Sequence, residues 1–319
     1  MTIALLGILT LAGCVVFPAP DSPAPSAQAL APTPPDAATN VPKENPPNSA
    51  SCNAEASLRP TPTQPEPRKM PPRTTMAAIA ARGRLIVGLD IGSNLFSFRD
   101  PITGDIQGFD VDLAREIARA IFGDPNRIEY RVLSADGRAQ ALRNQEVDVV
   151  VKTMSITCDR LRDNSFSAPY YVASQRILVL RGSGITGPAQ LAGKRVCAAR
   201  GSTAIGRMQS IQPRAKMVTT TTWADCLVML QQEQVDVVST DDAILAGLAS
   251  QDPWVTVVGP ALGEEYYGVG IPLGHNDMVR FVNGILQQLR ESGRWQEIYN
   301  RWLSILGPGN GPPQPIYRD

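Results

Sequence analysis

The chain has 319 residues, of which 43% are hydrophobic, and its 30 basic residues balance its 30 acidic ones. This composition is typical of a soluble globular protein, and the length leaves room for two domains. The balanced charge gives no indication of nucleic-acid binding.

The first thirteen residues are almost entirely apolar. This run is shorter than the roughly 20 residues that a membrane-spanning helix needs, and its position predicts a signal peptide over residues 1–13. No Lys or Arg precedes it, so we expect either that the basic n-region is missing or that the true start lies upstream. The tetrapeptide Leu11-Ala12-Gly13-Cys14 resembles the bacterial lipobox, which implies cleavage before Cys14 and a lipid on its sulfur. A chance cysteine after an ordinary signal peptide is the alternative.

Proline is concentrated in the next part of the chain. Residues 15–75 hold 16 of the 28 prolines, together with much Ala, Ser and Thr. Such a composition buries little apolar surface and favours an extended chain. We therefore predict that residues 14–75 form a lipidated tether, able to lift a domain on the order of 100 Å from a membrane. The protein is then extracytoplasmic and anchored to the cell membrane by Cys14.

The ordered body is predicted to begin with a strand and a helix. The apolar run at 83–88 predicts a buried strand. Phe96 and Phe98 follow in a turn-rich segment, where they belong either to the core or to the floor of a ligand pocket. Asp110 is then expected to cap a helix over 111–122 that ends at a glycine.

The string Val-Asp-Val-Val occurs twice, at 147–150 and 235–238, each time after a Leu- and Gln-bearing helical stretch. A second apolar run, at 193–198, matches the one at 83–88. This internal repeat predicts two similar α/β units. In open parallel sheets ligands bind outside the carboxyl ends of the strands. Two such edges are expected to form a charged cleft, with Lys152, Ser155 and Arg160 from one unit and Thr240, Asp241 and Asp242 from the other.

Two further apolar stretches, 175–180 and 266–272, bracket the second unit. They indicate that the chain crosses to the second unit and later returns, which makes a two-strand hinge. Amphipathic helices are predicted over 279–289 and 294–306, before Gly307-Pro308-Gly309 ends the order. The expected boundaries are 76–177 with 269–308 for lobe 1, 178–268 for lobe 2 and 309–319 for a disordered tail.

Four cysteines remain once Cys14 is set aside, an even number that suits an oxidising compartment. Cys197 ends a strand and Cys226 lies in a helix of the same unit, which favours that pair. Cys52 with Cys158 would then fasten the end of the tether to the first unit, although four cysteines allow three pairings. No CxxC spacing or histidine partner indicates a metal site, and no cofactor is expected.

Several motifs, taken together and in order, are specific to one family. They span residues 83–306: GFDVDLA at 108–114, SITCDR at 155–160, FSAPYY at 166–171, GKRV at 193–196, GST at 201–203, YGVGI at 267–271 and WQEIY at 295–299. The chain resembles the bacterial extracytoplasmic solute-binding proteins of family 3, the polar amino-acid receptors of ABC importers, in their glutamine/glutamate-binding type. The resemblance implies a type II periplasmic-binding-protein-like α/β fold, acting as a monomer that delivers its ligand to a permease and ATPase complex.

The resemblance also implies roles for residues of the cleft. Arg160 would fork onto the α-carboxylate of the ligand, because a planar guanidinium offers paired donors. A surface arginine at a helix start is the alternative. Asp241, rather than the adjacent Asp242, would pair with the α-ammonium. Closing on a zwitterion satisfies both charges at once, so ligand binding is expected to close the hinge.

Further polar groups are expected around the amino-acid head group. Ser155 would bind it, unless its hydroxyl only bonds to backbone. The loop Gly201-Ser202-Thr203 opens a helix whose free N–H groups suit the same carboxylate, although Ser202 is alternatively only a cap. Thr153 and Phe96 complete the expected ligand-binding set.

Lys152 follows the strand Val149–Val150–Val151, and a cation there needs a partner. The side chain of glutamate or aspartate would supply one, and the amide carbonyl of glutamine or asparagine could accept its hydrogen bond. Acidic amino acids are therefore expected first and amides second. The alternative is that Lys152 pairs internally with Asp90. Arg200, beside the GST loop, is a further candidate.

Two other functions compete with a transport receptor. Dehydratases and lytic transglycosylases share the implied fold, but the only histidine, His275, lies in a turn-like segment where a capping role outweighs that of a catalytic base, so no enzyme is expected. The second competitor is an amino-acid sensor whose ligand-bound form signals to a membrane partner. Its binding chemistry would be identical.

Overall fold

The computed structural model describes residues 32–47 and 52–319. The predicted signal peptide, 1–13, and the predicted lipidation of Cys14 lie outside the described residues. Residues Thr33–Asp319 form one compact unit. In the described part of the chain, no helix is both long enough and apolar enough to cross a membrane.

The first of two large sheets, which with its helices we call lobe 1, has the strand order β6-β2-β7-β15-β8. Strand β2 runs parallel to β6 and β7, whereas β15 runs antiparallel to β7 and β8. Its strands are β2 (Leu85–Leu89), β6 (Ile128–Val132), β7 (Val149–Val150), β8 (Asn164–Phe166) and β15 (Gly270–Pro272). Its helices are α1 (Thr75–Arg82), α2 (Phe109–Phe122), α3 (Arg138–Arg143), α7 (Asn276–Glu291) and α8 (Arg294–Trp302).

A small three-stranded sheet and a short helical turn complete lobe 1. The small sheet contains β3 (Gly92–Ser93), β4 (Ser97–Arg99) and β5 (Ile106–Gln107), and the turn is η1 (Arg160–Arg162). Aliphatic side chains of β2, α2 and α7 are buried together in one apolar cluster, so these elements share a core.

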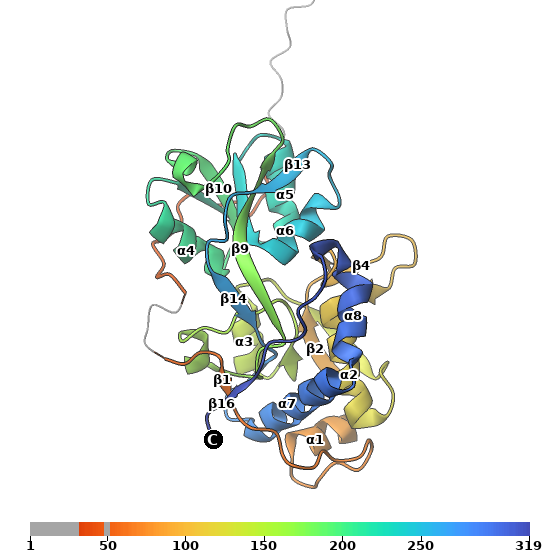
Figure 1. The fold of residues 1–319 in the computed structure, drawn as a ribbon. Coiled ribbons are helices and arrows are strands. Elements are labelled where there is room, and N and C mark those ends of the chain that lie inside the picture. The colour runs from red at the N-terminus through yellow and green to blue at the C-terminus, as the bar shows by residue number, and fades with distance from the viewer. Residues whose placement is uncertain (1–31, 48–51) are drawn as a thin grey trace, which may run out of the picture. The chain divides into compact units, whose positions relative to one another are not determined.

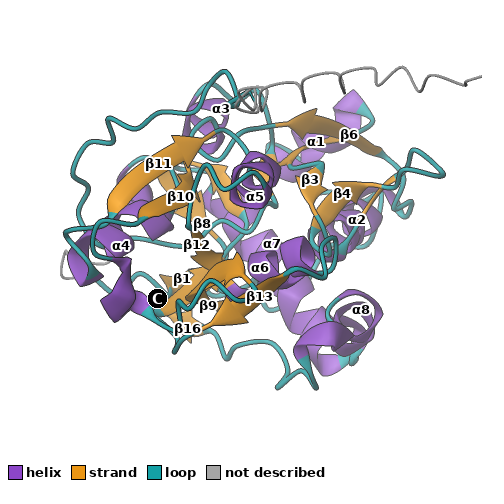
Figure 2. Cartoon of the chain, turned by 90° about the horizontal axis from the view of Figure 1, so that it is seen from above, coloured by secondary structure: helices purple, strands orange, loops and turns teal. Residues whose placement is uncertain are grey.

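The second large sheet, which with its helices we call lobe 2, has the order β11-β10-β12-β9-β13, with β14 added beside β9. Strands β10, β11 and β12 are parallel to one another, and Figure 2 shows them side by side with α4 and α5 packed beside them. The strands are β9 (Tyr171–Leu180), β10 (Arg195–Ala199), β11 (Lys216–Thr220), β12 (Val237–Asp241), β13 (Val255–Val258) and β14 (Glu264–Tyr267). The helices are α4 (Thr203–Ile211), α5 (Trp223–Gln231) and α6 (Asp242–Ala249), with 3-10 turns η2 (Pro188–Leu191) and, near the C-terminus, η3 (Ser304–Leu306).

Strands β9 and β14 connect the two lobes. The first residues of β9 pair with β14, and its later residues pair with β12 and β13. In Figure 1 the long green β9 runs alongside β14 between the helices of lobe 1 and those of lobe 2. Since β9 follows β8 and β14 precedes β15, the chain passes between the lobes twice in adjacent antiparallel strands, the arrangement expected of a hinge.

Helix α2 differs from the prediction at its first turn. It begins at Phe109, and its N-cap is Gly108 rather than Asp110. Gly108 has a φ of 136°, and a Cβ there would lie 2.2 Å from a backbone carbonyl oxygen, so only glycine fits. The carboxylate of Asp110 is buried and turned toward the interior instead of capping the helix.

Two segments predicted to lack order are in fact packed on lobe 1. Strand β1 (Ala56–Ser57), from the predicted tether, pairs parallel with β16 (Ile316–Tyr317), from the predicted disordered tail. The prediction was wrong for these residues because each segment supplies the backbone partners that the other lacks. The hydroxyl of Ser57 also donates to the carbonyl of Phe166 at 2.9 Å, which fixes β1 on the lobe.

The described cysteines form two disulfides, Cys52–Cys158 and Cys197–Cys226, which are the pairs that the sequence analysis favoured. The first fastens the chain ahead of β1 to lobe 1. The second lies within lobe 2, between β10 and α5.

Residues 33–47, which we call the N-terminal segment, lie on lobe 2. Ala38 and Thr219 exchange two backbone hydrogen bonds of 2.8 Å. The side chain of Gln209 accepts from the N–H of Glu44 at 2.8 Å and donates to the carbonyl of Pro42 at 2.9 Å. The chain therefore contacts lobe 2 before it reaches lobe 1 at Cys52.

Candidate functional site

Side chains from both lobes enclose a small cavity between them. Lobe 1 contributes Ala135, Arg138, Lys152, Thr153, Ser155 and Arg160, and lobe 2 contributes Ser202, Thr203, Ala204, Trp223, Thr240, Asp241 and Ile244. These residues follow or end the parallel strands β6, β7, β10, β11 and β12, so they meet at the carboxyl ends of two sheets, where the topology predicts a ligand site. Of the predicted ligand-binding residues, all but Gly201 and Phe96 line this cavity.

Arg160 bridges the two lobes. Its Nη1 donates to the carbonyl of Ser155 at 2.7 Å and its Nη2 to the carbonyl of Gly201 at 2.9 Å. Burial lowers the pKa of Arg160, while the carboxylates of Glu265 and Asp241 act in the opposite direction. No carboxylate of the described residues forms an ion pair with this guanidinium, which is therefore a half-buried cation held only by backbone carbonyls.

Asp241 faces the cavity from the end of β12. Its side chain is 5% exposed and accepts a hydrogen bond of 2.5 Å from the hydroxyl of Tyr267. Burial, together with the nearby carboxylate of Glu265, raises the pKa of Asp241. Among the described residues no cation forms an ion pair with it. A ligand ammonium placed here would stabilise the ionised carboxylate.

Lys152 is paired within the protein. Its ammonium lies 2.5 Å from a carboxylate oxygen of Asp90, so the internal partner that the sequence left open is the one observed. Although burial acts to raise it, the pKa of Asp90 is held below its usual value by Lys152 and by hydrogen bonds from Gly92 and Ser93. Lys152 still lines the cavity, where it can donate to a ligand as well as to Asp90.

The start of helix α4 closes the lobe 2 side. Ser202 is the N-cap residue, but its hydroxyl makes no capping bond, and its buried oxygen has no hydrogen-bond partner among the described residues. Gly201 does not line the cavity. Its φ is 75°, and a Cβ there would lie 2.6 Å from the Cα of Asp136 in lobe 1, so glycine is required for the close approach of the lobes.

Phe96 belongs to the core instead of the cleft. Its ring is fully buried and packs edge-on against Phe109, Tyr171 and Tyr267, with centroids 5.5–6.0 Å apart. The proposed pocket floor is therefore an aromatic cluster beneath the hinge. Edge-on packing of this kind stabilises such clusters beyond simple burial.

Thr153 occupies an uncommon backbone conformation beside the cavity. Its φ is 40°, and its N–H donates to Asp110 at 2.8 Å, while the hydroxyl of Tyr170 donates to the other carboxylate oxygen at 2.8 Å. Burial raises the pKa of Asp110 to about 7. Strained backbone of this kind is often found at functional sites. Asp110 thus fixes the turn that carries Lys152 and Ser155 into the cleft.

Sequence reasoning missed Arg138 and Trp223, which both line the cavity. Arg138 begins α3, a few residues beyond the carboxyl end of β6. The rule that drew attention to the ends of β7 and β12 applies equally to this strand, so the signal was present. Trp223 begins α5 after β11 and lies at the corresponding edge of lobe 2.

The other candidates lie outside the cavity. The guanidinium of Arg200 donates to the carbonyl of Asp36 at 2.7 Å, and its Nη1 lies 3.9 Å from Asp136. Asp242, the first residue of α6, accepts from the N–H of Ser174 in β9 at 3.1 Å. His275 is the N-cap residue of α7, with no side-chain cap bond.

The cleft is closed. The cavity has room for about one water molecule. Away from the cavity, the lobes also meet where Asn94 of lobe 1 donates to the hydroxyl of Ser250 at 2.8 Å, and a Cβ on Gly247 would lie 2.5 Å from the carbonyl oxygen of Asn94. An amino acid can therefore reach the charged residues only after the hinge opens.

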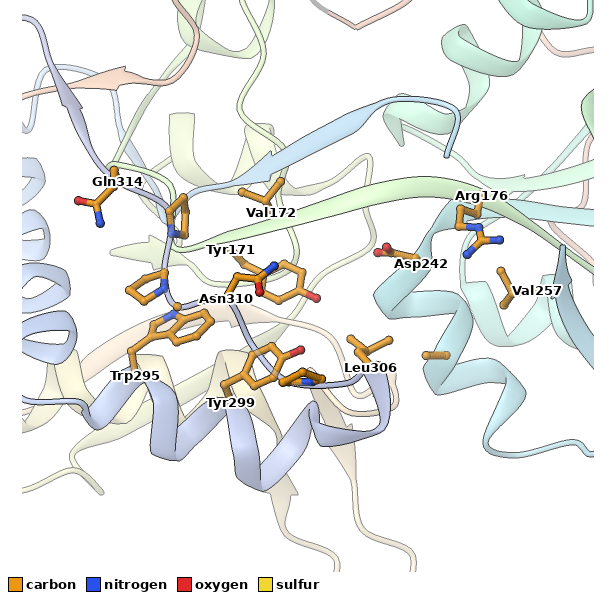
Figure 3. Close-up of a pocket in the computed structure, with 15 residues that line it drawn as sticks. Tyr171, Val172, Arg176, Asp242, Val257, Trp295, Tyr299, Leu306, Asn310 and Gln314 are labelled. Atoms are coloured by element: carbon orange, nitrogen blue, oxygen red, sulfur yellow. The ribbon is translucent and has the colours of Figure 1, made fainter. Parts of the chain in front are cut away.

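A larger hollow lies beside the hinge strand and is lined in part by the C-terminal residues. Figure 3 shows Trp295 and Tyr299 of α8 near Tyr171, with Arg176 and Asp242 toward the other end. Rings and prolines form much of its wall, whereas the smaller cavity gathers cations and a carboxylate from facing lobes. We take the smaller cavity as the candidate site because charge complementarity, not size, is what a polar ligand requires. In the described residues, no group of three or more His, Cys, Asp or Glu side chains could hold a metal ion.

Two α/β lobes, a two-strand hinge and a polar cleft between facing sheet edges define a type II periplasmic binding-protein fold. Residues 85–305 match the model of the bacterial extracellular solute-binding proteins, family 3, and the chain belongs to this family.

Similar proteins bear out this assignment. The ABC transporter glutamine-binding protein GlnH of Bacillus subtilis (strain 168) is 31% identical over 239 residues, which cover 75% of this chain and 88% of that protein. The structure of holo ArgBP from T. maritima superposes with a TM-score of 0.64 at 30% identity, covering 72% of this chain and 99% of the other. A solute receptor for L-cysteine of Neisseria gonorrhoeae shares the fold, with a TM-score of 0.72 at 24% identity and coverage of 76% and 100%.

Proposed function

We propose that this protein is a lipid-anchored extracytoplasmic receptor that binds a polar L-amino acid in the interlobe cleft and delivers it to an ABC importer. Glutamate and aspartate are the favoured ligands, followed by glutamine and asparagine. One observation carries the proposal. Arg160 and Asp241 line one cavity from opposite lobes, and among the described residues neither is in an ion pair.

The head group of an α-amino acid fits this pair of charges. Its carboxylate would replace the backbone carbonyls that now accept from Arg160, and a guanidinium binds a carboxylate through two parallel hydrogen bonds. Its ammonium would pair with Asp241, whose pKa is raised by burial and by the nearby carboxylate of Glu265, and the added cation would favour the ionised form. Since the two residues belong to different lobes, only a closed cleft satisfies both, so the zwitterion links ligand binding to hinge closure.

Smaller polar groups would complete the contacts. The hydroxyl of Ser202, which has no partner in the described part of the chain, and the N–H groups of the first turn of α4 are suited to an oxygen of the α-carboxylate. Ser155 and Thr153, held by the turn at Asp110, would contact the same head group from lobe 1. Gly201 allows the two lobes to approach each other closely beside these residues.

The side chain of the ligand would meet Lys152. An ammonium has three N–H donors, and among the described residues only the carboxylate of Asp90 accepts from this one. A carboxylate or an amide carbonyl can accept from the remaining donors. The carboxylate gains more, because hydrogen bonds between two charged groups are stronger than those with one neutral partner. This supports acids first and amides second.

The anchoring part of the proposal rests on the sequence before the described residues. Leu11-Ala12-Gly13-Cys14 matches the lipidation motif. Membership of a family of extracellular solute-binding proteins supports a location outside the cytoplasm. Glutamine binding by the relative from Bacillus subtilis, an ABC transporter protein, supports delivery to such an importer.

Calorimetric titration of the full chain with glutamate, aspartate, glutamine and asparagine tests the proposal. Ligand carried over from expression must first be removed by dialysis under partly denaturing conditions that leave both disulfides intact. Tightest binding of the acidic pair supports the proposal in full. Binding of the amides alone removes the acidic preference and leaves Lys152 a structural role. No binding to any of the four overturns the assigned ligand class.

A further inference from the structure

Arg138 is a buried cation that the head-group chemistry does not use. Arg138 is the first residue of helix α3, is 4% exposed and lines the cavity. Its Nε donates to the carbonyl of Ala135 at 2.9 Å and its Nη1 to the carbonyl of Lys152 at 3.0 Å. No ion pair of the described residues includes it, although a buried guanidinium is costly without an anion.

The carboxylates in and beside the cavity already have other partners. Asp90 is paired with Lys152, Asp110 accepts from Tyr170 and from a backbone N–H, and Asp241 accepts from Tyr267. Arg138 and Arg160 are therefore the two guanidiniums of the cavity that have only backbone carbonyls as partners.

The electrostatic surroundings of Arg138 also favour binding of an anion. Burial lowers its pKa to about 9, and repulsion by the neighbouring Arg160 acts in the same direction. Asp90 opposes this shift, but its carboxylate is shared with Lys152. An anion placed between the two guanidiniums would relieve both the burial cost and the repulsion.

From these observations we propose that Arg138 binds the side-chain carboxylate of an acidic amino acid and sets the preference for acids over amides. This inference rests on the proposed function, because it assumes that Arg160 takes the α-carboxylate. An amino-acid zwitterion offers one carboxylate, which satisfies one guanidinium. Glutamate or aspartate offers two, one for Arg160 and one for Arg138, with the ammonium left for Asp241. Glutamine and asparagine leave Arg138 with a neutral acceptor only.

Replacing Arg138 by glutamine and by lysine tests this role in the full chain. Arg138→Gln should weaken the binding of glutamate and aspartate by at least about tenfold, or about 1.4 kcal/mol, because a hydrogen bond between two charged groups is lost. The amides should change by less than about threefold, since glutamine still offers donors. Arg138→Lys, which keeps the charge, should recover part of the acid preference.

The matched control is Arg143→Gln on the same helix, where the exposed guanidinium pairs with Asp163 outside the cavity. It should leave all four affinities unchanged. Circular dichroism and thermal unfolding confirm that each variant is folded. Equal losses for acids and amides in Arg138→Gln, or an unchanged acid-to-amide ratio, would overturn the inference.

The role of Arg138 can also be tested without a variant, by changing the charge of the ligand. In the unaltered protein, L-glutamate should bind at least about tenfold more tightly than L-glutamine, the same charge being removed from the ligand instead of the protein. Equal affinities would contradict the role of Arg138 while leaving the amino-acid receptor intact. Failure of all four amino acids to bind would instead overturn the proposed function, so the two failures are distinguishable.

Discussion

The Nη2 atom of Arg160 in lobe 1 lies 2.9 Å from the carbonyl oxygen of Gly201 in lobe 2. In the closed cleft this hydrogen bond occupies the donor that a ligand α-carboxylate would take. A ligand must therefore exchange one interlobe contact for another, and the net gain comes from replacing a neutral acceptor by a charged one.

Replacing Arg160 by alanine should reduce the affinity for all four amino acids by roughly 100-fold or more, because loss of a buried partner of a carboxylate typically costs about 2–5 kcal/mol. Calorimetry provides the measurement. Arg162→Ala is the control, since Arg162 is largely exposed in the same turn and its ion pair in the described part of the chain is with Asp159. Retained affinity in Arg160→Ala would remove it from the site.

Replacing Lys152 by methionine should act on stability as well as on binding. It leaves the largely buried Asp90 without its cation, so we expect a loss of about 3–5 kcal/mol in the free energy of unfolding. The double variant Asp90→Asn with Lys152→Met should recover most of it, as measured by denaturant unfolding. For binding, glutamate and aspartate should weaken more than glutamine and asparagine, and equal losses would assign Lys152 a purely structural role.

Replacing Asp241 by asparagine should weaken binding but stabilise the empty protein. Asparagine keeps the acceptor for Tyr267 and removes a carboxylate whose pKa is raised to about 8 by burial and by Glu265. Between pH 4 and 8 the folded state holds a proton that the unfolded state has released, so this carboxylate makes stability fall as pH rises. The Tm advantage of the variant should therefore grow from pH 5 to 8 and level off above. A pH-independent Tm difference would contradict the assigned burial.

Replacing Gly247 by alanine tests whether ligand binding requires closure. Alanine favours the helix α6 by up to ~1 kcal/mol over glycine, but its Cβ would lie 2.5 Å from the carbonyl oxygen of Asn94 across the interface. The unliganded protein should unfold at the same or a higher temperature, while affinity falls. Gly206→Ala, on α4, meets the N-terminal segment instead of lobe 1 and serves as the comparison. Equal affinities in Gly247→Ala and the unaltered protein would show that binding does not need this contact.

The sequence predicted the candidate site best where the site residues directly follow recognisable strands in the chain. The repeated Val-Asp-Val-Val strings identified two sheet edges, and the side chains after them, including Arg160 and Asp241, do line one cavity. The partner of Lys152 was left open, because two candidate carboxylates, one internal and one from a ligand, satisfy the same cation.

Other features depend on contacts between distant residues, which composition cannot indicate. The prolines of 15–75 and the glycines near 309 predicted chain without order, yet β1 and β16 pair because each meets the other's free backbone groups on lobe 1. Asp110 has the residue type and position of an N-cap, but it is held by Tyr170 and Thr153, whose proximity arises only in the fold.

The N-terminal segment lies on lobe 2, and Cys52 is bonded to Cys158 of lobe 1. The chain between them is therefore a covalent connection between the lobes in addition to the hinge strands. From Pro47 to Cys52 this connection can span at most about 18 Å even when fully extended. The gap between these two attachment points cannot exceed that length while the segment stays in place. Wider opening requires residues 33–47 to detach from lobe 2, so residues that are not part of the hinge strands limit how far the hinge opens.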